Sequence, residues 1–90
     1  MLRKTAVRLF SFPDVTYELA VNNTICSGPG PSGSVLANEA DDHYACKEFC
    51  AEEPGCIGFI ISKTSGLCYR KESCTLSVNT DYIWIARQVV

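Results

Sequence analysis

The sequence predicts an α+β domain in which an antiparallel β-sheet packs with one α-helix and disulfides link the two. Ninety residues suffice for one hydrophobic core but not for two. One segment has the periodicity and end signals of a helix, whereas the other apolar segments are rich in β-branched and aromatic residues. Six cysteines, an even number at high density, are typical of a disulfide framework in a short chain. We therefore interpret residues 1–90 as a single domain stabilised by disulfides.

The N-terminal part of the chain predicts strand structure followed by a loop. Hydrophobicity alternates roughly at every second residue between residues 6 and 19, with a break at residues 13–14, and predicts two short strands or one bent strand. The apolar residues of this segment are Val7, Leu9, Phe10, Phe12, Val15, Tyr17 and Leu19. Residues 22–33 are rich in Asn, Gly and Pro and predict a loop that contains Cys26. A brief strand is expected at residues 34–36.

Residues 42–55 predict the helix. Asp41 or Asp42 provides an N-cap, and Pro54 followed by Gly55 ends the segment. The apolar positions of the segment fall on one face and are Ala45, Cys46, Phe49 and Cys50. Because two of these residues are cysteines one turn apart, the helix is expected to present two thiols on the same face.

A β-hairpin is predicted directly after the helix. Its strands are residues 56–62 and residues 67–71, which are joined by a four-residue connection that contains a glycine. Gly58 lies beside Phe59, and a glycine inside a strand often marks a close approach of another element. We therefore expect the first strand of the hairpin to pack closely against the helix.

The last apolar segment, residues 82–86, combines aromatic and β-branched side chains and predicts a buried strand. Trp84 is expected in the core rather than in a ligand site, because a short domain must bury its largest apolar side chains. With the hairpin, this strand completes the predicted sheet.

The spacing of the central cysteines suggests which thiols meet. Cys50 can reach Cys56 across the turn that ends the helix, and Cys46, one turn earlier, can reach Cys68 in the second hairpin strand. Six cysteines permit many other pairings, and geometry alone does not decide among them.

Three segments of this region carry a resemblance to a known family. They read Cys46-x3-Cys50, Pro54-Gly55-Cys56-x2-Phe59 and Gly66-Leu67-Cys68-Tyr69-Arg70-Lys71. In order and spacing they resemble the PAN/apple domains of plasminogen, hepatocyte growth factor, plasma prekallikrein and the microneme adhesins of apicomplexan parasites. The resemblance covers residues 42–71, about a third of the chain. It implies an antiparallel sheet wrapped around one helix, with disulfides from Cys46 to Cys68 and from Cys50 to Cys56.

The two outer cysteines depart from the family pattern. Apple-type members join the first strand to the last with a third disulfide, whereas residues 82–90 of this chain contain no cysteine. We pair Cys26 with Cys74 by elimination, and we expect both of them in loops.

The function that the resemblance implies is binding without catalysis. Such a module mediates protein–protein or protein–carbohydrate interaction outside the cell, and in a microneme protein it would serve attachment to a host cell. The alternative is a structural spacer in a multidomain secreted protease or growth factor. Residues 1–10 lack the apolar run of a signal peptide, so we expect a linker or added sequence there, in a domain taken from a larger secreted protein whose other modules are its neighbours.

Four residues are candidates for binding a ligand. Tyr69 offers an aromatic surface, and Lys63, Lys71 and His43 offer hydrogen-bond donors, a combination that carbohydrate sites often use. Alternation along the strand places Tyr69 and Lys71 on one side and Arg70 on the other. The simpler interpretation of the basic residues is a solvated hairpin face.

Other chemistries are disfavoured by the same residues. Zinc sites favour Cys-x2-Cys pairs, which the chain lacks, so His43 and the cysteines are not expected to bind a metal, and no cofactor is expected. Thiol–disulfide exchange would need a Cys-x2-Cys pair as well. A catalytic pair of His43 with Cys46 is disfavoured because Cys46 is expected in a disulfide. The chain is therefore not expected to be an enzyme.

Charge and one further motif complete the expectations. The net charge of −2 and the calculated isoelectric point of about 5.2 provide no basic field for nucleic acid or heparin. No membrane-inserting segment is expected either. Asn22, in the triplet Asn22-Asn23-Thr24, fits the acceptor rule for N-glycosylation in a secreted protein.

Overall fold

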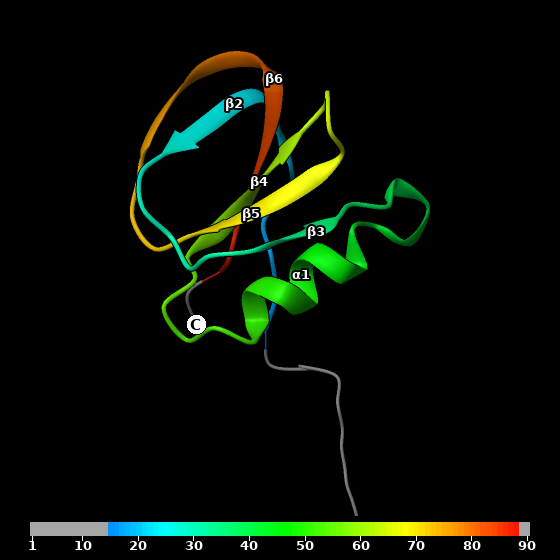
Figure 1. The fold of residues 1–90 in the computed structure, drawn as a ribbon, viewed down its shortest axis with the longest axis vertical. Coiled ribbons are helices and arrows are strands. Elements are labelled where there is room, and N and C mark those ends of the chain that lie inside the picture. Colours follow the sequence, from blue (N-terminus) through cyan, green and yellow to red (C-terminus); the bar gives the residue numbers. More distant parts are fainter. Residues whose placement is uncertain (1–14, 89–90) are drawn as a thin grey trace, which may run out of the picture.

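A computed structural model describes residues 15–88, in which one helix packs against one face of a five-stranded sheet (Figure 1). The elements are β2 (Val21–Ser27), β3 (Ser34–Leu36), the 3-10 helix η1 (Glu39–Asp41), α1 (Tyr44–Ala51), β4 (Gly58–Ser62), β5 (Leu67–Lys71) and β6 (Thr75–Ala86). The strand order is β2-β6-β4-β5-β3, and every neighbouring pair is antiparallel. The α+β class is therefore confirmed. Predicted strand residues before residue 15 lie outside the described part of the chain.

The helix is confirmed but is shorter than predicted at both ends. Before it, Asp42 and His43 both adopt left-handed backbone conformations, with φ of 61° and 60°, after the single turn of η1. The Oδ1 of Asp41 accepts a hydrogen bond from the backbone N–H of Tyr44 at 3.2 Å, so Asp41 satisfies one donor of the first helical turn. The helix ends at Ala51, ahead of the Pro-Gly pair.

The predicted hairpin and last strand are also present. The connection between β4 and β5 places Gly66 at a φ of 75°, and the N–H of Gly66 donates to the carbonyl of Ser62 at 2.8 Å. Strand β6 contains the predicted residues 82–86 but begins earlier, at Thr75. Its first residues pair with β2 and its last residues with both β2 and β4, so β6 bends between two neighbours.

One prediction for the N-terminal part was wrong. Residues 22–27 belong to strand β2 rather than to the start of a loop, because β6 pairs with all of them except Asn23. Asn23, with a φ of 55°, lies at a bulge in this pairing, which explains how an Asn-rich segment enters a strand. Within residues 15–19, the predicted strand structure is limited to one bridge between Tyr17 and Arg87, and the N–H of Glu18 donates to the carbonyl of Ala86 at 2.9 Å.

The two faces of the sheet carry separate hydrophobic clusters. The face covered by α1 buries Phe59, which is fully inaccessible and meets Tyr17 edge to face at 5.7 Å between ring centres. Its other buried members are Cys46, Cys50, Cys56, Ile61, Cys68 and Ile85. The opposite face buries Cys26, Ile60 and Trp84. Trp84 is only 6% exposed, as predicted for a core residue.

Three disulfides link all six cysteines, and their pairing agrees with the expectation. They are Cys46–Cys68, Cys50–Cys56 and Cys26–Cys74. The first two attach α1 to the hairpin. The third joins β2 to the segment before β6, so Cys26 lies in a strand and not in a loop as expected, whereas Cys74 lies between strands.

One packing prediction needs correction. A Cβ atom at Gly58 would overlap the ring of Trp84 and the carbonyl of Ile85, and none of its three nearest atoms belongs to α1. Gly58 therefore permits close contact between β4 and β6 rather than between β4 and the helix. None of the helices in residues 15–88 is long and apolar enough to cross a membrane.

Candidate ligand-binding site

The four predicted ligand-binding residues lie in two separate places. His43 and Lys63 line one cavity at the N-terminal end of α1, although they are far apart in the sequence. Tyr69 packs with the hydrophobic cluster on the other face of the sheet, and Lys71 lies two residues further along the same strand. The sequence pattern found both groups, but the fold does not combine them into one site.

The His43 cavity, as we name the first place, lies between the start of α1, the β4–β5 turn and β6. Its volume is about 270 Å³. It is lined by Ala37, Glu39, His43, Ile61, Ser62, Lys63, Gly66 and Ile83. The apolar part of this lining comes from the helix-covered face of the sheet, and the polar part comes from the two turns.

His43 is positioned by the backbone rather than by its side chain. Its N–H donates to the carbonyl of Asn38 at 2.9 Å, and its carbonyl accepts from the N–H of Lys47 at 3.0 Å. The Nδ1 atom of His43 is buried and has no hydrogen-bond partner among residues 15–88. A buried polar atom without a partner costs about 1–3 kcal/mol, so this turn is held in place by the backbone at the expense of the ring nitrogen.

Lys63 is held at the opposite rim of the cavity by two hydrogen bonds. Its backbone N–H donates to the carbonyl of Asp81 at 2.7 Å, and its Nζ donates to Oδ1 of Asn23 at 2.7 Å. One of three ammonium hydrogens is thereby engaged, and two remain for other acceptors. Lys63 thus links the hairpin turn to the bulge of β2.

Hydroxyl and carboxylate groups continue this rim. The Ser62 hydroxyl donates to Oδ2 of Asp81 at 3.3 Å and accepts from the N–H of Ser65 at 3.2 Å. The Thr64 hydroxyl donates to the other carboxylate oxygen of Asp81. Glu39, which is exposed, adds a carboxylate at the helix side of the cavity. Sequence reasoning missed Glu39, Ser62 and Asp81, because only the folded turns bring them together.

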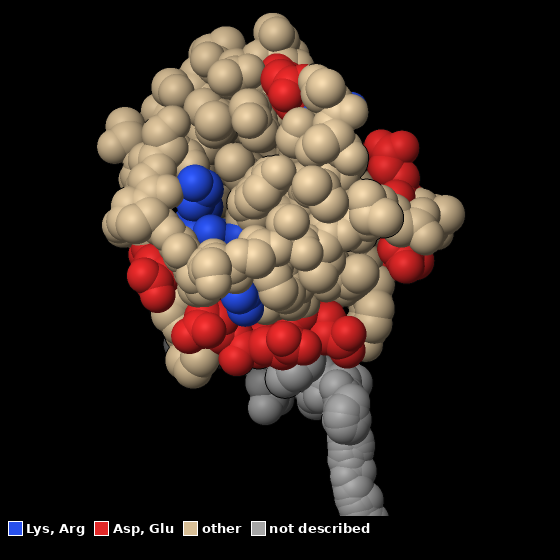
Figure 2. Space-filling view, in the orientation of Figure 1, with Lys and Arg blue, Asp and Glu red and all other residues tan. Residues whose placement is uncertain are grey.

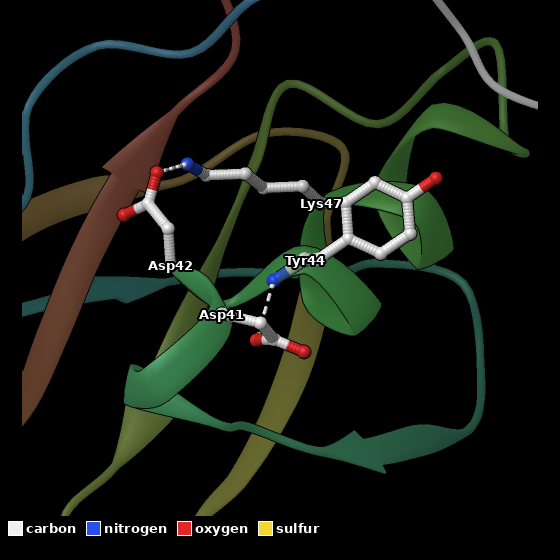
Figure 3. A network of polar contacts seen from close by, with 4 residues as sticks. All are labelled: Asp41, Asp42, Tyr44 and Lys47. Atoms are coloured by element: carbon white, nitrogen blue, oxygen red, sulfur yellow. Dashed lines mark hydrogen bonds and ion pairs between the residues drawn. The ribbon is translucent and has the colours of Figure 1, made fainter.

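A surface network fixes the turn that carries His43 (Figure 3). The Nζ of Lys47 lies 2.7 Å from Oδ2 of Asp42, and the hydrogen bond from Lys47, together with its positive charge, lowers the pKa of the Asp42 carboxyl. Asp41, on the other side of the same turn, accepts from the N–H of Tyr44. Asp41 and Asp42, the two residues before His43, are therefore both bound to residues in the first turn of α1.

The face that carries Tyr69 offers a different surface. Tyr69 is half-buried among Ile60 and Trp84, and Lys71 donates from Nζ to the carbonyl of Gly28 at 2.8 Å. As predicted from alternation, Arg70 points to the helix side, where its guanidinium lies 3.8 Å from the ring centre of Phe49. Figure 2 shows a narrow group of basic atoms near the middle of the view, a row of acidic atoms along the lower edge of the described part, and further acidic atoms at the top and on both sides. Lys71 is thus occupied by a backbone carbonyl, and Arg70 by an aromatic ring.

The glycosylation triplet lies beside the His43 cavity. Asn22 is exposed on the edge strand β2 and is paired with Ile83, a residue of the cavity lining, so the two side chains share one face of the sheet. The Thr24 hydroxyl donates to the carbonyl of Asn22 at 3.1 Å. The structure places the predicted acceptor on an accessible strand edge.

A second hollow of about 200 Å³, which no sequence pattern predicted, lies along the outer side of α1. Val15, Tyr17, Tyr44, Lys47, Glu48 and Ala51 line it. The Tyr17 hydroxyl donates to the carbonyl of Lys47 at 2.6 Å, and burial raises the pKa of Tyr17 to about 12. This contact fixes the N-terminal segment to the helix.

Comparisons with known proteins add no relative. No protein-family model, no curated protein and no solved structure matches the chain. Within residues 15–88, no group of three or more His, Cys, Asp or Glu side chains is placed to hold a metal ion. The His43 cavity is therefore the candidate site on geometry alone.

Proposed function

We propose that this chain is a non-enzymatic, extracellular binding module that recognises a protein or glycan through the His43 cavity. The observation that carries the proposal is the meeting of His43 and Lys63 at one cavity. Cys46–Cys68 fixes that arrangement, because it ties the first turns of α1 to the hairpin that carries Lys63. A site held in this way binds without first ordering its own loops, which favours affinity.

An extracellular location is supported by the disulfides. Three disulfides in a domain of this size are typical of oxidising compartments. The helix, the antiparallel sheet and the pairing of the four central cysteines are compatible with a PAN/apple module. We extend the proposal to adhesion on that resemblance, with attachment to a host cell as the role in a microneme protein.

The main alternative is a spacer that only separates its neighbours in a longer protein. A spacer gains length when its two ends lie far apart. Here Tyr17 bridges Arg87, and the N–H of Gln88 donates to the carbonyl of Thr16 at 2.9 Å. The two ends of the described chain lie side by side, so this module adds little length, which favours a binding role.

A cell-binding experiment tests the proposal. The disulfide-bonded protein, tetramerised through a C-terminal biotin, is applied to a panel of cultured animal cells and to immobilised glycans. We expect binding that Lys63→Ala reduces by about tenfold, since a charged hydrogen bond contributes about 1.5–3 kcal/mol. Lys71→Ala, a lysine change on the opposite face, is the matched control and keeps binding. Absence of binding to every cell and glycan would support the spacer instead.

A further inference from the structure

We infer that the His43 cavity accepts one neutral, hydroxylated ring, such as a single hexose unit of a glycan. This inference rests on the proposed function and names its ligand. It follows from four properties of the cavity, which are its size, its pattern of donors and acceptors, its apolar floor and its charge.

The size of the cavity limits the ligand to one small ring. Sites for drug-sized ligands generally measure about 300–1,000 Å³, and this cavity, at about 270 Å³, falls just below that range. A peptide strand or a helix face would need a longer groove. A single sugar ring, with the rest of the glycan in solvent, matches the available space.

The polar groups of the rim favour hydroxyl groups. Glu39 only accepts hydrogen bonds, and the free ammonium hydrogens of Lys63 only donate. A hydroxyl does both, so neighbouring hydroxyls of one ring can satisfy the two rims together. His43 adds an imidazole to the lining, which can donate or accept a hydrogen bond according to its tautomer.

The floor of the cavity suits the C–H face of a ring. Ile61 and Ile83 lie opposite each other on β4 and β6, and both belong to the helix-covered face of the sheet. Ala37 extends the apolar lining. A pyranose ring has polar edges and a less polar face, so it can cover the isoleucines while its hydroxyls reach the rim.

Charge selects a neutral ring over an acidic one. Among residues 15–88, Lys63 is the only Lys or Arg in the cavity lining, whereas Glu39 also lies in the lining and Asp81 is hydrogen-bonded to Ser62 of the lining. Nearby, Asp42 and Lys47 neutralise each other as an ion pair. A ligand carboxylate would therefore meet more negative than positive charge, which lowers its affinity.

The test is a titration followed by two-dimensional ¹H–¹⁵N NMR of the intact disulfide-bonded protein. The probes are methyl β-galactoside, methyl β-glucoside, methyl α-mannoside and N-acetylglucosamine, with glucuronate and N-acetylneuraminate as acidic counterparts. We expect at least one neutral sugar to shift the amide signals of His43, Lys63 and Ile83. We expect the acidic sugars to bind about tenfold more weakly or not at all.

Two variants locate the site. Lys63→Ala is expected to weaken binding of the responding sugar about tenfold, whereas Lys71→Ala leaves it unchanged. A native-like spectrum of each variant shows that the fold is intact. His43→Gln retains a hydrogen-bonding group without the ring and is expected to cause a smaller loss than Lys63→Ala.

Three results would overturn the inference. They are the absence of shifts with every neutral sugar, tighter binding of an acidic sugar, and shifts confined to the strand that carries Tyr69. If cell binding remains sensitive to Lys63→Ala while no sugar binds, the proposed function stands and only the ligand class fails. If cell binding is also absent, both fail.

Discussion

The helix-covered face of the sheet and the opposite face bury similar side chains but are covered by different parts of the chain. On the first, Phe59 lies beneath α1, and two disulfides spanning 22 and 6 residues attach the helix nearby. On the second, Trp84 lies beside Cys26, whose disulfide spans 48 residues. The helix-covered face is thus held by disulfides between segments close in the sequence, whereas the disulfide at the opposite face joins segments that are distant in the sequence. The following predictions test whether this difference governs stability.

The largest expected effect concerns the disulfides. In the chain-entropy model, the stabilisation grows with the length of the closed loop and amounts to about 4 kcal/mol for Cys26–Cys74, about 3 for Cys46–Cys68 and about 2 for Cys50–Cys56. Replacing both cysteines of one pair with alanine should therefore destabilise the protein most at the opposite face. Urea unfolding of the three double variants measures the order. The reverse order would show that the two disulfides of the helix stabilise the protein by something other than the lower entropy of the unfolded chain.

A smaller effect is expected from Gly58→Ala. The added methyl would overlap the Trp84 ring, and overpacking of this kind costs about 1–3 kcal/mol. Gly66→Ala is the control, because its methyl meets no atom within 4 Å and only the left-handed backbone opposes it, at about 1 kcal/mol. Urea unfolding gives both values, and tryptophan fluorescence should change only in Gly58→Ala. Equal losses of stability in the two variants, with no change in tryptophan fluorescence, would contradict a close contact between Gly58 and Trp84.

The smallest effect concerns Tyr17 on the helix-covered face. Its pKa is raised by burial from 10.0 to about 12, so the unfolded chain releases this proton at lower pH than the folded one. The contribution of the protonated Tyr17 hydroxyl to the stability of the folded state is complete below pH 10 and is lost as the pH rises toward 12.

Tyr17→Phe provides the comparison. At neutral pH it should be about 1 kcal/mol less stable than the parent, because the hydrogen bond to the Lys47 carbonyl is lost. The difference should narrow above pH 10, since the variant has no proton to release at this position. Urea unfolding at several pH values measures it. A constant difference across that range would mean that Tyr17 is not shielded by the fold.

Local signals made the helix and the hairpin predictable from the sequence. Cys46 and Cys50 lie one turn apart, and the connection before Leu67 contains the glycine that its turn requires. Such features depend on neighbours in the sequence, so they survive any uncertainty about tertiary contacts. The pairing of the four central cysteines was predicted from the PAN/apple resemblance, because the geometry of these two elements leaves other pairings open.

Strand β2 and the His43 cavity depended on contacts between distant segments. Asn22 and Asn23 disfavour strand structure locally, and only pairing with β6 overrides that preference. On β6, Leu76 and Val78 are 53% and 86% exposed, so they do not carry the pattern of a buried strand. The cavity arises where the turn of His43 meets the hairpin turn, and no spacing in the sequence reports that meeting.

The bridge between Tyr17 and Arg87 has a consequence for attachment. Strand β4 runs from Gly58, which is paired with Ala86 near that bridge, to Ser62 beside the cavity. A linker joined to either end of the described chain would therefore leave the domain near the Gly58 end of β4, whereas Lys63 lies at the opposite end of that strand. In a tandem array, each such unit would project sideways from the line of linkers, and its cavity would face away from the neighbouring units.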